Sequence, residues 1–207
     1  SESTSSHTTV GFVTETGKKD FTKPDNTVYS SYYAKVVTPD GTVNEYATSS
    51  DRSSLKCAVV NVSFTNGKAS LSRAKGYDSV SGKFNSEKNK FGDYTLADDV
   101  KILDTAGTTS DDLAMYTRIY PQRLDGVTIK SSSVLYYSKN KAGEIDELIL
   151  KDITGDAYKY GVITAADSTT HTYTIDIDGT QNTYATAFST NVRGPHRFSM
   201  NQTGIES

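Results

Sequence analysis

Residues 40–48 of this chain, DGTVNEYAT, return as DGTQNTYAT at residues 178–186, with seven of the nine positions identical. Two further matches keep the same order: GFVT at 11–14 corresponds to GVIT at 161–164, and VSFTN at 62–66 corresponds to FSMN at 198–201. A sequence that repeats itself over a long spacing usually reuses one folding unit to build length or surface. The chain is therefore predicted to contain one unit twice, and the repeat favours an architectural role over catalysis.

The composition indicates that this unit is built from strands. The chain has 14 Tyr, no Trp and only two Met among 207 residues, with abundant Thr, Ser and Val. Tyr, Thr and Val suit a pleated surface that is half buried. Short strands joined by hairpins are typical of small barrels or sandwiches, and a closed barrel leaves no unpaired edge. The predicted fold is all-β, with two to three small β-barrel or sandwich-like units in tandem and one short helix.

These units divide the sequence into four parts. We expect a flexible N-terminal segment at 1–8, a first repeated β-unit at 9–76, a middle β-unit at 77–159 and the second copy of the repeated unit at 160–207. Residues 158–163 carry no Gly/Pro/Ser-rich linker, so they are predicted to form one strand region that leaves the middle unit and begins the second copy.

Local signals place the turns and the helix. Asp40-Gly41 and Asn66-Gly67 lie between strand-like runs and predict hairpin turns, and Gly143 predicts a hairpin loop in the middle unit. Residues 97–99 predict a bend within the strand that starts near Tyr94. The run 110–116 is the one helix candidate, because Ser110 can cap it and two acids follow at its positive end.

Charge and cysteine content exclude several functions. Lys and Arg (22) are scattered among Asp and Glu (25), so the net charge of −3 gives no basic patch, and nucleic acid is not an expected partner. No apolar run reaches the roughly 20 residues that span a bilayer. The single cysteine, Cys57, excludes an intramolecular disulfide, and its place in the strand-like run 57–64 predicts a small buried apolar residue rather than a nucleophile.

Several phrases of the middle and C-terminal sequence are similar to known repeats. They are YTLADDV at 94–100, LDG at 124–126, VLYY at 134–137 and DITGDAYKYG at 152–161. From about Tyr94 onward the chain resembles the repeat region of large clostridial and related Firmicutes cell-surface proteins, which often carry S-layer homology domains. The resemblance implies an extracellular, non-enzymatic module at the cell wall of a Gram-positive bacterium, and it assigns no functional residue. Its implied partners are neighbouring domains of the same surface protein and cell-wall or host glycans.

The sequence shows no constellation typical of an enzyme. His7, His171 and His196 form no His-Glu-x-x-His motif, and there is no Gly-x-Ser-x-Gly elbow or phosphate-binding glycine loop. Asp176 and Asp178 resemble the start of a calcium loop, but the Glu expected at its twelfth position is missing, so a plain hairpin turn is favoured. We therefore expect no catalytic residue, no cofactor and no bound metal.

One segment can still bind a ligand. Arg193, His196 and Arg197 flank a Gly-Pro turn, and their cationic groups can hold a carboxylated glycan. The alternative is a simple loop that leads into a strand. Two functions stay open: a structural module of a cell-surface protein, and a glycan- or host-ligand-binding adhesin module.

Overall fold

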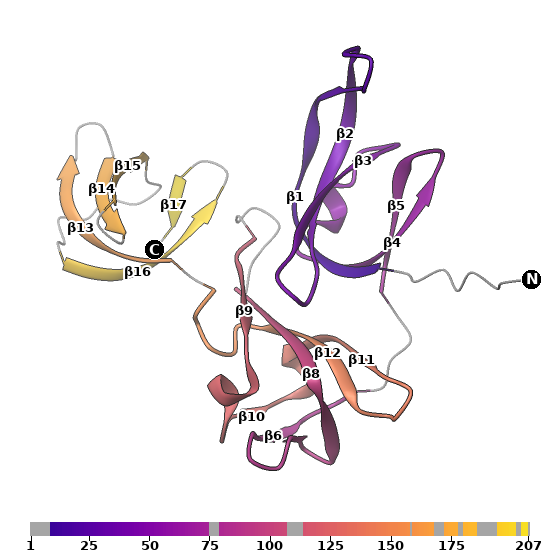
Figure 1. The fold of residues 1–207 in the computed structure, drawn as a ribbon. Coiled ribbons are helices and arrows are strands. Elements are labelled where there is room, and N and C mark those ends of the chain that lie inside the picture. Colours follow the sequence, from indigo (N-terminus) through magenta and orange to yellow (C-terminus); the bar gives the residue numbers. More distant parts are fainter. Residues whose placement is uncertain are drawn as a thin grey trace, which may run out of the picture.

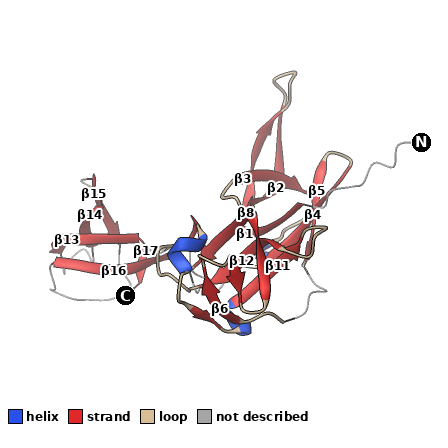
Figure 2. Ribbon diagram, turned by 60° about the horizontal axis from the view of Figure 1, so that its bottom comes forward, coloured by secondary structure: helices blue, strands red, loops and turns tan. Residues whose placement is uncertain are grey.

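The chain is all-β in a computed structural model that describes residues 9–74, 79–106, 114–157, 159–167, 172–177, 180–185, 194–201 and 204–206 (Figures 1 and 2). Strands provide nearly all of the regular structure, as the composition predicts. Within the described ranges the helical elements are three short 3-10 turns: η1 (Ser53–Leu55), η2 (Pro121–Leu124) and η3 (Ser131–Ser133).

The first sheet closes into a barrel. Its strands are β1 (Thr9–Thr22), β2 (Val28–Val37), β3 (Val43–Thr48), β4 (Val59–Thr65) and β5 (Lys68–Arg73). They pair in the order β1-β2-β3-β5-β4, with β4 returning to β1, and β3 meets β5 in parallel where Thr48 lies opposite Ala69. This order, closed by one parallel contact, is the connectivity of the five-stranded OB barrel. Alternate apolar residues fill its interior: Val13, Ala34, Val36, Val60, Val62, Ala69 and Leu71.

Both predicted turns of the barrel are confirmed. Asn66 and Gly67 have φ of 52° and 77°, and they join Thr65 to Lys68 in the two-residue turn that needs positive φ at both positions. Gly41 has φ of 86°, and its N–H donates to the Thr38 carbonyl at 2.8 Å. Turn chemistry alone thus sets the register of the β2–β3 and β4–β5 hairpins.

The second sheet contains β6 (Gly82–Asn85), β7 (Lys90–Phe91), β8 (Tyr94–Thr105), β9 (Tyr116–Ile119), β10 (Thr128–Ile129), β11 (Val134–Lys139) and β12 (Ile145–Lys151). Its order is β10-β6-β7-β8-β12-β11, with β9 also paired to β8, and β8 and β12 run parallel. The β11–β12 hairpin turns at Gly143, with φ of 79°, as predicted. The predicted bend at 97–99 lies within a continuous β8, whose pairing jumps from Leu96–Ile145 to Lys101–Glu147. This irregularity curves the sheet around its core.

The helix predicted at 110–116 is not found where the structure describes that run. Residues 110–113 lie outside the described ranges, Ala114 and Met115 are irregular, and Tyr116 already begins β9. Tyr116 and Thr117 lie opposite Thr105 and Asp104 of β8. Cross-strand pairing of these β-favouring residues outweighs the local capping signal.

The barrel and the second sheet share a buried apolar junction. Phe12, Val37 and Val59 of the barrel form one cluster with Leu103 and Ile149 of the second sheet. At the edge of this junction, Nη1 of Arg118 donates to the Asp40 carbonyl at 3.3 Å. These two parts therefore pack as neighbours through their cores and not through a flexible linker.

The carboxyl group of Glu147 makes the stability of this region depend on pH. Burial raises the pKa of Glu147, the nearby charges of Asp146 and Asp40 raise it further, and Lys101 opposes them. A carboxyl with a raised pKa destabilises the fold when ionised, so the penalty is present above its folded pKa and vanishes below the ordinary glutamate value, about pH 4. We expect Glu147→Gln to raise the urea midpoint at pH 7 and to leave it unchanged at pH 3.5. Equal midpoints at pH 7 would contradict this.

The third sheet repeats the barrel strand for strand. It contains β13 (Lys159–Asp167), β14 (Thr172–Ile177), β15 (Thr180–Ala185), β16 (Gly194–Asn201) and β17 (Gly204–Glu206). Its order, β15-β14-β13-β16-β17, matches β3-β2-β1-β4-β5 of the barrel. The register also matches, because β1 has an irregularity directly after Val13 and β13 has one directly after Ile163, positions that the sequence repeat aligns.

The two copies differ in the length of one hairpin. Gly17 pairs with Tyr33 in the barrel, and the corresponding pair of the third sheet is Asp167 with Thr172. Four residues, 168–171, connect that pair of the third sheet, whereas fifteen residues, 18–32, connect Gly17 to Tyr33, and β1 and β2 stay paired as far as Thr22–Val28. The first copy therefore carries an extension that the second lacks.

The strand predicted at 158–163 is confirmed for residues 159–163, which belong to β13. β13 begins at Lys159 and pairs with β14 and β16 of the third sheet, Tyr158 lies outside the described residues, and 152–157 form a turn. Asp152 and Gly155 have φ of 49° and 73°, which breaks the strand geometry. The turn is held to β8 by the buried carboxylate of Asp104, which accepts from Thr154 N at 2.8 Å.

Candidate functional site

The predicted ligand residues lie in the third sheet. His196 and Arg197 belong to β16, opposite Gly161 and Tyr160 of β13. Arg193 and the side chains of His196 and Arg197 lie outside the described part of the structure. The predicted Gly-Pro turn is wrong, because Gly194 and Pro195 are already paired in β16, opposite Ile163 and Val162 of β13.

The other candidates for chemistry remain dispersed. No group of three or more His, Cys, Asp or Glu that could hold a metal occurs among the residues that the structure describes. Asp176 lies in β14, and Asp178 is outside the described ranges. Asp98 and Asp99 are exposed on β8. Asp156 binds Arg123 at 2.8 Å, and this hydrogen bond lowers the pKa of Asp156.

Cys57 requires a correction. It lies in the turn between η1 and β4, with φ of 64°, and it is half buried, whereas the sequence predicted a buried strand residue. Its N–H donates to the Val13 carbonyl at 2.9 Å, and its side chain packs against the junction cluster. The backbone bond to β1 holds the residue in this uncommon conformation.

The outer part of the β1–β2 hairpin is the most distinctive exposed surface. It projects from the barrel away from the second sheet (Figure 1). Directly opposed residues share a face, so the pairs Gly17–Tyr33, Lys19–Ser31 and Phe21–Tyr29 place their side chains on one side of the hairpin. We call five residues on this side the hairpin ladder: Lys19, Phe21, Lys23, Tyr29 and Tyr33.

The ladder alternates ammonium groups with aromatic rings. Nζ of Lys19 lies 5.1 Å from the ring centroid of Tyr33 and 5.3 Å from that of Phe21. The rings of Phe21 and Tyr29 stack with centroids 5.7 Å apart, and Nζ of Lys23 lies 5.4 Å from the Tyr29 centroid. Exposed cation–π pairs contribute about 0.5 to 1 kcal/mol each, so these contacts order the hairpin without a core.

The base of the ladder is fixed to the barrel. A Cβ on Gly17 would lie 2.9 Å from the Tyr33 ring, so the glycine is what allows this ring to lie across β1. Burial raises the pKa of the Tyr33 hydroxyl, as do the charge and hydrogen bond of Glu15. Lys35 binds Glu15 at 3.1 Å, and Lys19 pairs with Glu45. Tyr33 therefore has a defined position on the strand face.

The opposite side and the tip of the hairpin are also ordered. Nζ of Lys18 lies 5.3 Å from the centroid of Tyr32, and Val28 is 59% exposed. At the tip, Asp25 accepts from Thr27 N at 2.9 Å and Thr27 Oγ1 at 2.5 Å, which lowers the pKa of Asp25. The carboxylate of Asp25 is therefore bonded within the tip, and the apolar side chain of Val28 beside it is exposed.

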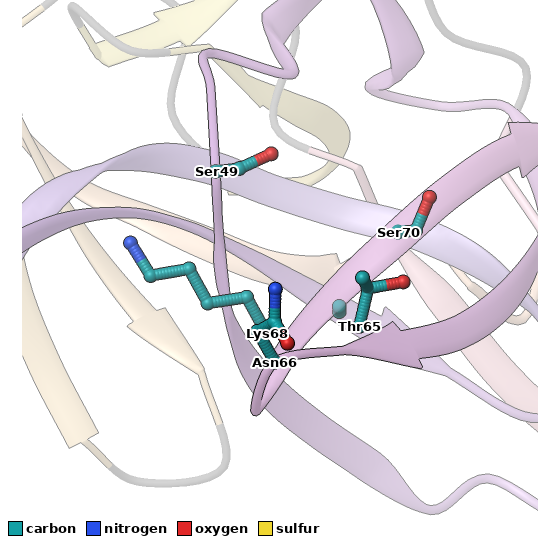
Figure 3. Close-up of a pocket in the computed structure, with 6 residues that line it drawn as sticks. Ser49, Thr65, Asn66, Lys68 and Ser70 are labelled. Atoms are coloured by element: carbon teal, nitrogen blue, oxygen red, sulfur yellow. The ribbon is translucent and has the colours of Figure 1, made fainter.

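A second feature is a shallow pocket of about 400 Å³ at the seam where β3 meets β5 (Figure 3). The lining carries hydroxyl, amide and ammonium groups but no carboxylate, imidazole or thiol, so Lys68 is its one ionisable side chain. The residues are Ser49, Thr65, Asn66, Lys68, Ala69 and Ser70.

No helix in the described residues is long and apolar enough to cross a membrane.

The sequence analysis missed the hairpin ladder because Tyr32-Tyr33 resembles ordinary cross-strand packing. The alternation of Lys and aromatic residues over 18–33 was the signal that could have predicted it.

No protein-family model, curated protein or solved structure matches this chain.

Proposed function

We propose that this chain is a non-enzymatic structural module of a bacterial cell-surface protein, of the S-layer-like, wall-associated kind. The observation that carries the proposal is the duplicated five-stranded unit, in which two sequence copies share strand order and register although the pairing closes into a barrel in the first. Reuse of one unit builds length rather than a single reaction centre. The buried junction between the barrel and the second sheet adds the stiffness that such an array requires.

The remaining observations support this reading. The chain has a single cysteine, and the lining of the described pocket brings together no carboxylate, imidazole or thiol. The proposed site of action is the cell wall of a Gram-positive bacterium, and it rests on the resemblance of the sequence phrases from Tyr94 onward to clostridial surface repeats. Its partners would be neighbouring domains of the same protein. The OB connectivity by itself assigns no function, because such folds carry many.

Surface location is the direct test. Intact cells of the source organism would be labelled with an antibody raised against residues 9–157, before and after mild protease treatment. We expect labelling of intact cells that protease removes. Labelling that appears only after lysis would contradict a cell-surface role, and a cytosolic protein serves as the control for cell integrity.

The second candidate function is a glycan- or host-ligand-binding adhesin module. The projecting β1–β2 hairpin is the observation that favours it, because it displays rings and ammonium groups that the barrel core does not need. The cationic residues Arg193, His196 and Arg197 remain further candidates for the same role.

A further inference from the structure

We infer that the hairpin ladder binds a linear acidic polysaccharide, with its rings packed on the sugar faces and Lys23 paired with a carboxylate. The inference rests on the second candidate function and deepens it by naming a site and a ligand class. It places the ligand on the first barrel, away from the segment that contains Arg193.

Beyond its base, where Lys19 pairs with Glu45 and Ser31 Oγ donates to the Thr48 carbonyl, the hairpin extension adds nothing to the barrel core. No residue from 18 to 30 is buried. The third sheet keeps the strand order and register of the barrel, although its hairpin ends at the pair equivalent to Gly17–Tyr33. An ordered, exposed extension present in one copy of a duplicated unit is therefore explained by interaction and not by barrel stability.

The surface chemistry selects a sugar polymer. Aromatic faces pack against the C–H faces of sugar rings, and residues two apart on a strand repeat about every 7 Å on the same side. The stack of Phe21 and Tyr29 lies between the ammonium groups of Lys19 and Lys23. A sugar polymer that lies along the hairpin would contact aromatic rings and ammonium groups alternately.

The charges select an acidic polymer. Lys23, on the ladder side, rests over the Tyr29 ring and has no carboxylate within salt-bridge distance among the described residues, whereas Lys19 pairs with Glu45. The nearby acids do not neutralise this charge. The carboxylate of Asp25 accepts a hydrogen bond from Thr27, and Asp20 lies opposite Ser30 on the other side of the hairpin from the ladder. The free charge of Lys23 favours a carboxylate, and this single charge suits a polymer with one charge per sugar better than the dense charge of nucleic acid.

The test uses polygalacturonate as the acidic probe, with its methyl-esterified form as the neutral control and oligothymidylate as the nucleic-acid control. Calorimetry on the full chain at low salt should show binding of polygalacturonate alone. Tyr29→Ala and Lys23→Ala should each weaken it by about fivefold, the effect of losing one such contact. Lys68→Ala, which removes a lysine of the seam pocket, should leave the affinity unchanged.

A chimera separates binding from folding. Residues 18–32 would be replaced by residues 168–171, the shorter connection at the equivalent place in the second copy. We expect the chimera to keep the cooperative unfolding of the barrel and to lose polygalacturonate binding. Undiminished binding by the chimera, tighter binding of oligothymidylate, or no binding by the wild-type chain would each overturn the inference. The cell-surface labelling test stands independently of these outcomes.

Discussion

Replacing Asp104 by Ala is expected to lower the free energy of unfolding by about 3 kcal/mol, since it leaves buried donors without an acceptor. Asp104 is 0% exposed, and its carboxylate accepts from Thr105 N at 3.1 Å and Ile153 N at 3.2 Å. It also accepts from Thr154 N at 2.8 Å and Thr154 Oγ1 at 2.6 Å. One side chain thus holds the turn after β12 against β8.

Urea unfolding followed by circular dichroism measures this effect. Asp99→Ala is the matched control, because Asp99 is an exposed aspartate on the same strand, and its loss should change stability by less than about 0.5 kcal/mol. Asp104→Asn keeps one carbonyl oxygen and should fall between the two. If Asp104→Ala were as stable as Asp99→Ala, the carboxylate would not be the anchor described here.

Phe12→Ala is expected to destabilise the barrel by about 3 to 4 kcal/mol and to loosen its attachment to the second sheet. Phe12 is 1% exposed and packs in the junction cluster with Leu103 and Ile149. Truncation opens a cavity between the two parts and not inside either one. NMR relaxation should give one correlation time for both parts in the wild-type chain and separate, shorter times in the variant.

Val13→Ala tests whether this loosening is specific. Val13 is the next residue on β1, is 0% exposed and faces the barrel interior. Its truncation should destabilise the barrel while the two parts still tumble together. Joint tumbling of the Phe12→Ala chain, or separate tumbling of the Val13→Ala chain, would contradict the role assigned to the junction.

The features that could be predicted from the sequence are those that depend on the local residue types alone. Asp40-Gly41, Asn66-Gly67 and Gly143 specify their turns through positive φ, and the alternation of apolar residues specifies the strands. The repeat at 40–48 and 178–186 foreshadowed a shared strand order. These signals need no knowledge of distant partners.

Features that depend on distant pairing could not be predicted in this way. The parallel contacts of β8 with β12 and of β3 with β5 join segments whose local sequence does not specify a partner. The helix predicted at 110–116 is contradicted at Tyr116, which begins β9 because β8 supplies a strand partner for it. Cys57 was wrongly predicted to lie in a strand because its conformation depends on a hydrogen bond to β1. The ladder was missed because the length of the β1–β2 pairing decides which tyrosines extend beyond the barrel core.

The pairing of β1 and β5 on either side of β4 also determines how the barrel would carry mechanical load. Thr9 lies opposite Val62, and Arg73 lies opposite Val60, with β1 and β5 both antiparallel to β4. Tension applied at Thr9 and Arg73 would pull β1 and β5 in opposite directions along β4. Because the interstrand hydrogen bonds are perpendicular to the strands, this force would load the bonds of each ladder together in shear and not open them one after another. A barrel connected in this way resists extension between its two ends.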